Sequence, residues 1–326
     1  MEILGLVILF VVFGLVLTPT LGLLATWVDR KVTARVQYRV GPPWYQPFAD
    51  VVKLMGKETI VPRAASKMAF LISPLIGLAG TTLAAMIIWM AIIKPGIGFG
   101  GDLIVVVYLL ILPALAMIFG GLASANPLAS VGASREMKLA MAYELPFILM
   151  IVVVLIKSSG KLQLGELVAM QQTNGVFVGS ISGVLALIVA ILCTQAKLGQ
   201  VPFDAAEAET ELTGGIMVEY SGTPLAMFKL TRAMLYIVVP MFVVVLLCGG
   251  IDVVRGNEAL GPFILGIILG VLKYVGLLVL VVLIRNTNPR LQIKNAIKFF
   301  WGHVTLLAII AVILAFMGKQ LKIGWF

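Results

Sequence analysis

Residues 200 to 222, QVPFDAAEAETELTGGIMVEYSG, gather an unusual number of side chains that can bind and release protons. The chain has 15 acidic residues in all, and five of them fall within this stretch: Asp204, Glu207, Glu209, Glu211 and Glu219. No Lys or Arg lies between Lys197 and Lys229 to neutralise them. Clustered carboxylates repel one another, and their affinity for protons rises further when they leave water. The stretch therefore predicts a proton-handling site, with a solvated acidic loop as the alternative.

The spacing of these acids and the apolar residues among them favour the first interpretation. If the segment is helical, Asp204, Glu207 and Glu211 fall within about 60° of one another around the helix axis. Glu209 then points well away from this carboxylate stripe. Large apolar side chains such as Phe203 lie between the acids, and a loop that is merely solvated is seldom so apolar.

Two further ionisable residues lie inside long apolar runs. Glu144 precedes Pro146, which weakens the local helical hydrogen bonding. Ionisable residues at such depth are costly and are functional candidates by default. The alternative is that Glu144 reaches water at the interface or pairs with Lys138.

Lys273 lies near the middle of another apolar run, where a lysine side chain costs on the order of 3 kcal/mol. A structural ion pair and a role in ion transport are both open for this lysine.

The elements that must position these residues are membrane-spanning helices. The chain is 61% hydrophobic and only 12% charged, with a mean hydropathy of +1.10, which is typical of an integral membrane protein. About eight runs are long enough to cross a bilayer as helices: 3 to 28, 68 to 93, 103 to 124, 139 to 156, 176 to 196, 233 to 251, 259 to 284 and 299 to 318. No internal repeat or low-complexity linker divides them. We therefore expect an all-α polytopic membrane protein with one integral membrane domain, residues 1–326.

The distribution of basic residues predicts the orientation. The connections that follow the odd-numbered spans carry 17 of the 24 Lys and Arg residues, and basic residues are retained on the cytoplasmic side. Both termini should therefore lie outside the cell membrane, and residues 197 to 232 should face the cytoplasm. The net charge of +9 follows from this bias and from contact with anionic lipids, so nucleic acid is not an expected partner.

The residues that bind metals and redox cofactors are scarce. Cys193, Cys248 and His303 are the only cysteines and histidine, too few for an iron–sulfur cluster, a zinc site or a transmembrane haem. No nucleotide-binding fingerprint is present either. We therefore expect this chain to bind no cofactor, so that any redox centre belongs to a partner subunit.

The connection between the first two spans contains a candidate docking surface. Residues 47 to 57 place apolar side chains on one side of a helix, Phe48, Val51, Val52 and Met55, and charged ones largely elsewhere, Asp50, Lys53 and Lys57. This pattern is typical of an interfacial amphipathic helix. This helix either simply lies on the membrane or forms a platform for a soluble partner. The candidate platform residues are Arg30, Lys31, Arg35, Arg39, Asp50 and Lys53.

Four blocks of the sequence together resemble one known family. They are DRKVTARVQYRVGPPWYQPFADVVKLMGKE (29 to 58), SREMKLAMAYELP (134 to 146), VPFDAAEAETELTGGIMVEYSG (201 to 222) and RNTNPRLQIKNAIKFFWG (285 to 302). The chain resembles the membrane subunit shared by respiratory complex I, where it is subunit 1 or H, and by the group 4 membrane-bound [NiFe] hydrogenases and their sulfur-reducing relatives. The third block is the most specific, and the resemblance covers essentially the whole chain.

The resemblance implies a non-catalytic subunit that anchors a peripheral redox arm and couples it to ion transport. The implied partners are a [NiFe]-hydrogenase-like large subunit and a small iron–sulfur subunit, which hold the metal centres, and antiporter-like membrane subunits. The acids carried over by the resemblance as a proton or ion path are Glu144, Asp204, Glu207, Glu209, Glu211 and Glu219, and Lys273 is a further candidate from its position.

One departure from complex I favours a particular branch of the family. In complex I the first connection is longer between its Gly-Pro and Gln-Pro motifs and helps to form the quinone site, whereas here residues 41 to 47 run straight through. We therefore expect a ferredoxin-linked, ion-translocating hydrogenase or sulfur-reductase complex. A quinone-site subunit of a complex I-like dehydrogenase is the alternative within the family, and a stand-alone ion transporter is the alternative outside it.

Overall fold

The structure is a computed structural model that describes residues 5, 7, 10–93, 98–251 and 260–321. Within these residues the regular secondary structure is helical and there is no strand, so the all-α prediction is confirmed. Seven helical stretches in this described part are long and apolar enough to cross a membrane, and an apolar helix of 17 residues supplies an eighth. Eight helical crossings were expected, and each predicted run coincides with one of these stretches.

The crossings follow one another in chain order. They are η1 (Phe10–Leu17) continuing into α2 (Thr18–Val36), α4 (Lys67–Ile93), α5 (Asp102–Leu109) with α6 (Leu112–Ala123), α7 (Pro127–Lys157), α9 (Ile181–Lys197), α11 (Gly222–Leu247), α12 (Leu260–Thr287), and α13 (Ile293–Lys298) with η4 (Phe299–Val304) and α14 (Thr305–Leu321). The short elements between them are α3 (Gln46–Met55), α8 (Leu164–Asn174), η2 (Phe177–Gly179), α10 (Glu209–Leu212) and η3 (Gly215–Met217).

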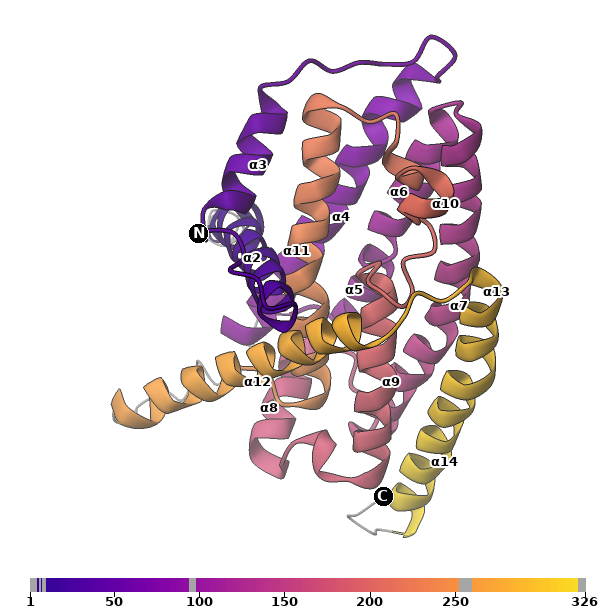
Figure 1. Cartoon of the computed structure of the whole chain (residues 1–326). Helices are drawn as coiled ribbons and strands as arrows, with labels where there is room; N and C mark the ends of the chain where they lie inside the picture. The colour runs from indigo at the N-terminus through magenta and orange to yellow at the C-terminus, as the bar shows by residue number, and fades with distance from the viewer. Residues whose placement is uncertain (1–4, 6, 8–9, 94–97, 252–259, 322–326) are drawn as a thin grey trace.

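Helix α11 forms the centre of the bundle (Figure 1). In its most apolar 18-residue stretch 89% of the residues are buried, against 28% in the corresponding stretch of α12. From Ala233 to Leu247 nearly every side chain of α11 is apolar, and a helix that is hydrophobic all round is stable only where it is surrounded. Gly22 of α2 supports this packing, because a Cβ there would collide with the backbone of Ala233. Small residues of this kind let membrane helices approach closely.

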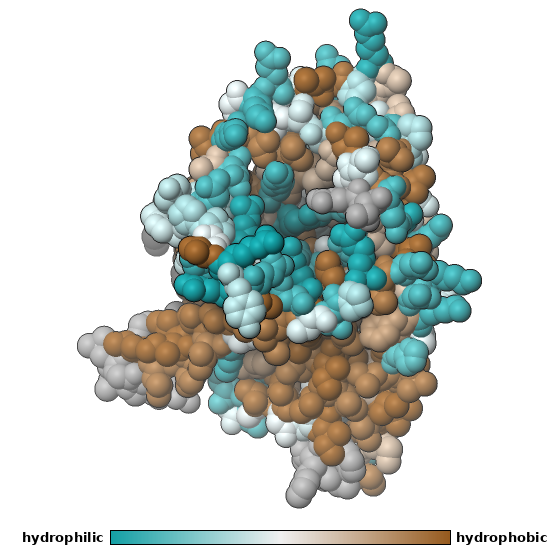
Figure 2. Space-filling view, in the orientation of Figure 1, coloured by the Kyte–Doolittle hydropathy of each residue, from teal (hydrophilic) through white to brown (hydrophobic). Residues whose placement is uncertain are grey.

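Helix α12 is the exception to the parallel bundle. It crosses the bundle obliquely, and its first half projects from the body (Figure 1). Figure 2 shows this projecting part as an apolar surface. The exposed apolar residues along it include Ile264, Leu265, Ile268, Leu269 and Leu272. In a membrane this surface lies against lipid or against another protein chain.

Two helices extend beyond the apolar runs that identified them. Helix α2 continues to Val36, so Arg30, Lys31 and Arg35 lie on its last turns rather than in a connection. Helix α7 begins at Pro127, where the side chain of Asn126 accepts a hydrogen bond from the Leu128 amide at 2.8 Å. Hydropathy locates the part of a helix that lies in lipid, whereas charged residues continue the helix outside it.

The polar residues concentrate at one end of the bundle. This end carries the connections 37–66, 198–221 and 288–292, and we call it the charged end; the other end carries the connection 158–180. Figure 2 shows hydrophilic side chains gathered over this part of the surface, above the apolar helix α12. The chain therefore separates charge from apolar surface along the axis of the bundle.

Candidate ion-coupling site

The segment between α9 and α11 folds as a series of turns and not as a continuous helix. Within it only Glu209–Leu212 form an α-helical turn, α10, and Gly215–Met217 form the short helix η3. Residues 201 to 207 form turns and bends, so the helical turn begins only at Glu209, and the positive φ values of Thr213, Gly214 and Gly215 end it. The carboxylate stripe expected for a helix across these residues was therefore wrong. The acids are presented from turns.

Basic residues from other parts of the chain neutralise these acids. The ion pairs are Asp204 with Arg290 (2.6 Å), Glu207 with Arg232, and Glu211 with Arg135 (2.5 Å). The three arginines come from the connection before α13, from α11 and from α7. The missing cations of the local sequence are thus supplied from 25 to 86 residues away.

The other two acids of the segment, Glu219 and Glu209, take no part in these three ion pairs as far as the structure describes them. Glu219 accepts a hydrogen bond of 2.6 Å from the side-chain amide of Asn126. That contact ties the end of the segment to the start of α7. The side chain of Glu209 lies outside the described residues, so its partners are not part of the site described here.

Close packing holds the segment in place. Gly215 has φ of +59°, and a Cβ on it would collide with the carbonyl of Ala206. Only glycine therefore allows the backbone at position 215 to pack this closely against the backbone of Ala206. The ring of Tyr220 stacks on Phe70 with centroids 4.0 Å apart, and its hydroxyl donates to the Phe70 carbonyl at 3.0 Å. Burial raises the pKa of Tyr220 to about 12. The phenol therefore stays protonated and keeps its hydrogen bond.

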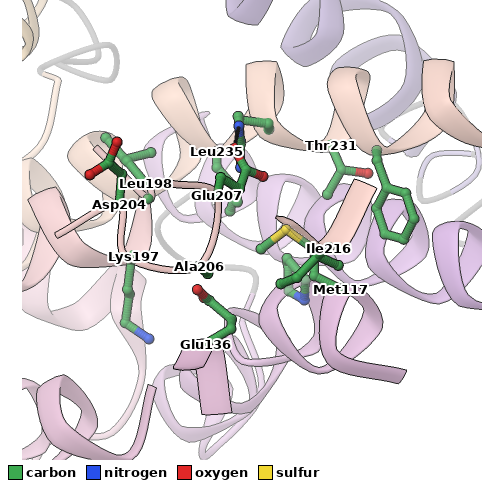
Figure 3. A pocket seen from close by; sticks show the side chains of 14 residues that line it. Met117, Glu136, Lys197, Leu198, Asp204, Ala206, Glu207, Ile216, Thr231 and Leu235 are labelled. Carbon is green, nitrogen blue, oxygen red and sulfur yellow. Dashed lines mark hydrogen bonds and ion pairs between the residues drawn. The ribbon is translucent and has the colours of Figure 1, made fainter. Parts of the chain in front are cut away.

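A largely enclosed cavity lies beneath the segment, against α7, α9 and α11 (Figure 3). Five charged side chains line it: Glu136, Lys197, Asp204, Glu207 and Arg232. The remaining wall is mostly apolar and includes Met117 and Leu235. The space open to the centres of water molecules is about 20 Å³, enough for one or two waters. The cavity can therefore hold water among carboxylates and cations.

Glu144 forms an ion pair with a buried lysine. The ammonium of Lys197 lies 2.8 Å from one carboxylate oxygen of Glu144, and the lysine side chain is only 3% exposed. The same ammonium lies over the rings of Tyr143 and Phe147, at 5.1 and 4.5 Å from their centroids. The other oxygen of Glu144 is buried without a hydrogen bond. The partner of Glu144 is thus Lys197 from α9, and the suggested pairing with Lys138 was wrong.

Glu136 belongs to the cavity but was not singled out in the sequence. It is 6% exposed, and Figure 3 shows its carboxylate directed toward the loop that carries Ala206 and Glu207. The signal was its helical spacing, because Glu136 precedes the buried residues Leu139 and Tyr143 by three and seven positions. Arg135 and Lys138 lie close to it in the sequence, so local charge alone does not single it out.

A second buried acid anchors α12 to the body. Asp29 is 5% exposed, pairs with Arg285 of α12 and accepts a hydrogen bond of 3.3 Å from the Tyr236 hydroxyl of α11. Nearby, the side-chain amide of Asn286 donates to the Thr33 hydroxyl at 3.1 Å. Both contacts join α2 to the last turns of α12. Sequence analysis placed Asp29 in a connection and therefore gave it no partner.

Lys273 has a backbone partner among the described residues. Its ammonium donates to the carbonyl of Cys248 at 2.7 Å. Cys248 caps the end of α11, where exposed carbonyls favour a nearby cation. The oblique course of α12 brings Lys273 to this helix end, on the side opposite to the acids. Lys273 is therefore not brought together with the other candidate residues.

The platform residues lie at the charged end. Arg30 pairs with Asp50 of α3 at 2.9 Å, and the Gln46 side chain donates to Asp50 at 2.9 Å. Partial burial opposes ionisation of Asp50, but these hydrogen bonds and the Arg30 charge outweigh it and lower the pKa of Asp50. Helix α3 forms where it was expected, and Phe48 and Val51 of its predicted apolar side pack against the body. Val52 and Met55 of the same predicted side are 68% and 51% exposed. Lys31 is partly exposed, and Arg35, Arg39 and Lys53 are exposed.

The arrangement suits ion and proton handling. In the described part of the chain, no group of three or more His, Cys, Asp or Glu side chains is placed to hold a metal ion. The titratable groups instead form a connected set: Glu207 and Asp204 on the segment, Glu136 in the cavity, and Glu144 joined to the cavity through Lys197. Protons can move along such a set through side chains and intervening water.

Comparison with known proteins agrees with the extent of this fold. Residues 6–316 match the family described as NADH dehydrogenase. The H-type subunit of NADH-quinone oxidoreductase from Thermomicrobium roseum is 33% identical over 344 residues, which cover 98% of this chain and 98% of that protein. The protein of the same name from Bacillus thuringiensis is 32% identical, covering 98% and 93%.

A solved structure is similar over almost the same length. It is a chain of the membrane-bound sulfane sulfur reductase, described as an archaeal respiratory membrane complex. The TM-score is 0.82 at 28% sequence identity, and the match covers 95% of this chain and 99% of that one.

Proposed function

Because the chain belongs to the NADH dehydrogenase family and is like the H-type subunit of NADH-quinone oxidoreductase over nearly its whole length, we propose that it is the membrane anchoring and coupling subunit of a ferredoxin-linked, ion-translocating respiratory complex. The redox arm carries a [NiFe]-hydrogenase-like large subunit and a small iron–sulfur subunit, which hold the metal centres. Antiporter-like membrane subunits move protons or sodium ions. This chain lies between them in the cell membrane and binds no redox centre itself.

The observation that carries this proposal is the ion-paired segment over the cavity. Residues 198 to 221 lie at the charged end, where a peripheral arm can contact them, and their carboxylates line a space that leads to Lys197 and Glu144 inside the bundle. A charge or shape change at the segment would alter its ion pairs with Arg232 and Arg290. Coupling requires an element that both sites bias, and this segment lies between the cavity and an open hollow at the surface.

Two observations favour a hydrogenase or sulfur reductase over a quinone reductase. The structural match to the sulfane sulfur reductase chain extends over 95% of this chain. The cavity beneath the segment has room for one or two waters, and a quinone headgroup needs a far larger pocket. The alternative is a quinone-site subunit, which the names of the curated relatives favour. In that case a quinone would bind between this chain and a partner subunit.

Purification of the complex through a tag on this chain tests the proposal. We expect iron–sulfur and [NiFe]-like subunits to co-purify in mild detergent, and the complex to reduce protons or a sulfur compound with reduced ferredoxin. Quinone-site inhibitors should have little effect. Fast quinone reduction that these inhibitors block would establish the alternative, and a single active chain without partners would instead indicate a stand-alone transporter.

The proposed orientation has a separate test. With the charged end in the cytoplasm, both chain termini lie outside. A cysteine introduced at the exposed position Thr173 should react with an impermeant thiol reagent added to intact cells, whereas one at the exposed position Ala64 should not. The parent chain, with its own Cys193 and Cys248, sets the background. The reverse labelling pattern would exclude contact between residues 198 to 221 and a cytoplasmic redox arm.

A further inference from the structure

Glu136 is a buried carboxylate that the ion-paired arrangement leaves without a cation of its own. It is 6% exposed and lines the cavity. Among the described residues no ion pair or hydrogen bond joins its carboxylate to another side chain. The guanidinium of Arg232, which lines the same cavity, is already held by both oxygens of Glu207. An ionised carboxylate in such a place is costly, so water or a proton must satisfy it.

The charged groups around Glu136 come from every element that packs on the cavity. Glu207 and Asp204 face it from the segment, Arg232 from α11 and Lys197 from α9, while Tyr143 lies two turns further along α7 itself. Lys197 is paired with Glu144. Each cation in this set thus has a carboxylate closer than Glu136. Glu136 is the acid of the cavity that can change its protonation without breaking an ion pair.

One ion pair separates the cavity from the surface. Outside the cavity lies an open hollow of about 300 Å³, whose walls include Thr213, Gly214 and Lys229. Glu207 and Arg232 line both the hollow and the cavity. Their side chains are 24% and 29% exposed, so the pair faces water on one side and the cavity on the other. Breaking this pair would join the two spaces.

We propose that Glu136 holds the exchangeable proton of the cavity and that the Glu207–Arg232 ion pair is the gate between Glu136 and the surface hollow. With the gate open, a hydronium ion in the hollow gives a proton to Glu207 and becomes water. A cavity water then accepts a proton from Glu207 and passes one on to Glu136, so that Glu207 is ionised again. With the gate closed, Arg232 holds Glu207 ionised and Glu136 keeps its proton. Each step moves one proton between oxygen atoms, so no oxidant or reductant is needed.

Infrared difference spectroscopy on the purified complex tests the proton and the gate without any turnover. A carboxylic acid band is expected in the parent and should be absent in Glu136→Gln. The matched control Glu166→Gln removes an exposed acid at the far end, 49% exposed, and should keep the band. A band that persists in Glu136→Gln would overturn the proposal.

The gate is tested by transfer into heavy water. In Arg232→Gln the shift of the band should occur roughly tenfold faster than in the parent, because loss of a partly buried ion pair favours local opening. Arg135→Gln is the matched control: it breaks the pair with Glu211, which lines a different hollow and not the cavity. Equal exchange rates in the parent and in Arg232→Gln would exclude a gate at this pair.

A third measurement rests on the proposed function. In vesicles that contain the assembled complex, Glu136→Gln should lower ion translocation per electron on the order of 100-fold, as for loss of an acid–base group. Glu136→Asp should restore part of it. A parent complex that translocates no ion would refute the proposed function while leaving the infrared result intact. A parent and a Glu136→Gln variant that translocate equally well would refute only the role of Glu136.

Discussion

The two ends of the bundle use charge in different ways. At the charged end, six ion pairs among the described residues join segments that lie 20 to 256 positions apart. At the opposite end Lys161 pairs with Glu166, which lies five positions away, and both side chains are about half exposed. Ion pairs between distant segments therefore hold the charged end together, whereas this pair at the opposite end is local.

Hydrogen bonds to the backbone also hold the opposite end. The buried side chain of Asp102 accepts from the Leu164 amide at 2.7 Å, and the Gln171 side chain donates to the Val245 carbonyl at 3.0 Å. These contacts give hydrogen-bond partners to polar groups that are buried away from water. Buried ion pairs are often no better for stability than apolar residues of the same size. The charges at the other end are thus better explained by what they do than by the stability they add.

The largest expected effect separates the buried pair from the exposed one. Glu144→Ala leaves the ammonium of Lys197 buried without a carboxylate, which should lower the free energy of unfolding by about 3 kcal/mol. Glu166→Ala removes one member of an exposed pair and should cost less than about 1 kcal/mol. Unfolding of the purified chain in a denaturing-detergent titration measures both. Equal losses would mean that burial does not distinguish the two ends.

The second prediction concerns ion transport. Glu207→Gln and Glu144→Gln keep the size and hydrogen bonding of the side chain, so the complex should assemble. Translocation should nevertheless fall on the order of 100-fold, because an amide does not exchange the proton. The control Glu166→Gln at the opposite end should pump like the parent. If both variants match the parent in vesicles, the acids at the charged end are only a solvated and ion-paired surface.

Sequence reasoning located the helices and the acids but not the contacts between them. Hydropathy and length identify a membrane helix from its own residues, and each of the eight apolar runs coincides with a helix. The cation for each acid comes from a distant segment, as with Arg232 for Glu207. No local window contains that information. The segment looked free of cations only because its neighbours in space are not its neighbours in sequence.

The same limit explains why the sequence did not predict the turns of residues 201 to 207 or the burial of Glu136. A carboxylate stripe was expected on the assumption that residues 204 to 211 are helical. Residues 201 to 207 instead form turns, and the helical turn begins only at Glu209. Sequence analysis did not single out Glu136, although its spacing places it on the buried face of α7. Turn geometry and burial depend on tertiary packing, which is decided by contacts from other helices.

The third prediction compares two glycines that share a backbone conformation. Gly215 at the charged end and Gly160 at the opposite end have φ of +59° and +85°. A Cβ on Gly215 would collide with the Ala206 carbonyl, whereas nothing lies within 4 Å of one on Gly160. Gly160→Ala should therefore cost about 1 kcal/mol from backbone strain alone, and Gly215→Ala roughly 2 kcal/mol or more. Thermal unfolding in detergent measures the difference. Equal losses of unfolding free energy in the two variants would show that residues 198 to 221 can shift to accommodate the added methyl group.

The smallest expected effect tests whether exposure, rather than the end of the bundle, sets the strength of a pair. Arg30 and Asp50 lie at the charged end but are 46% and 34% exposed, like the pair at the opposite end. Asp50→Asn should therefore lower the free energy of unfolding by less than about 1 kcal/mol at neutral pH.

The pH dependence of this effect tests its electrostatic origin. The pKa of Asp50 is lowered in the folded chain, so the stabilisation of the fold by ionised Asp50 is complete above the unfolded pKa of about 3.9. It is lost as the pH falls through the folded value, where Asp50 takes up a proton. The stabilities of the parent and of Asp50→Asn should converge over that acidic range, and a difference that persists below it would assign the effect to packing rather than to charge.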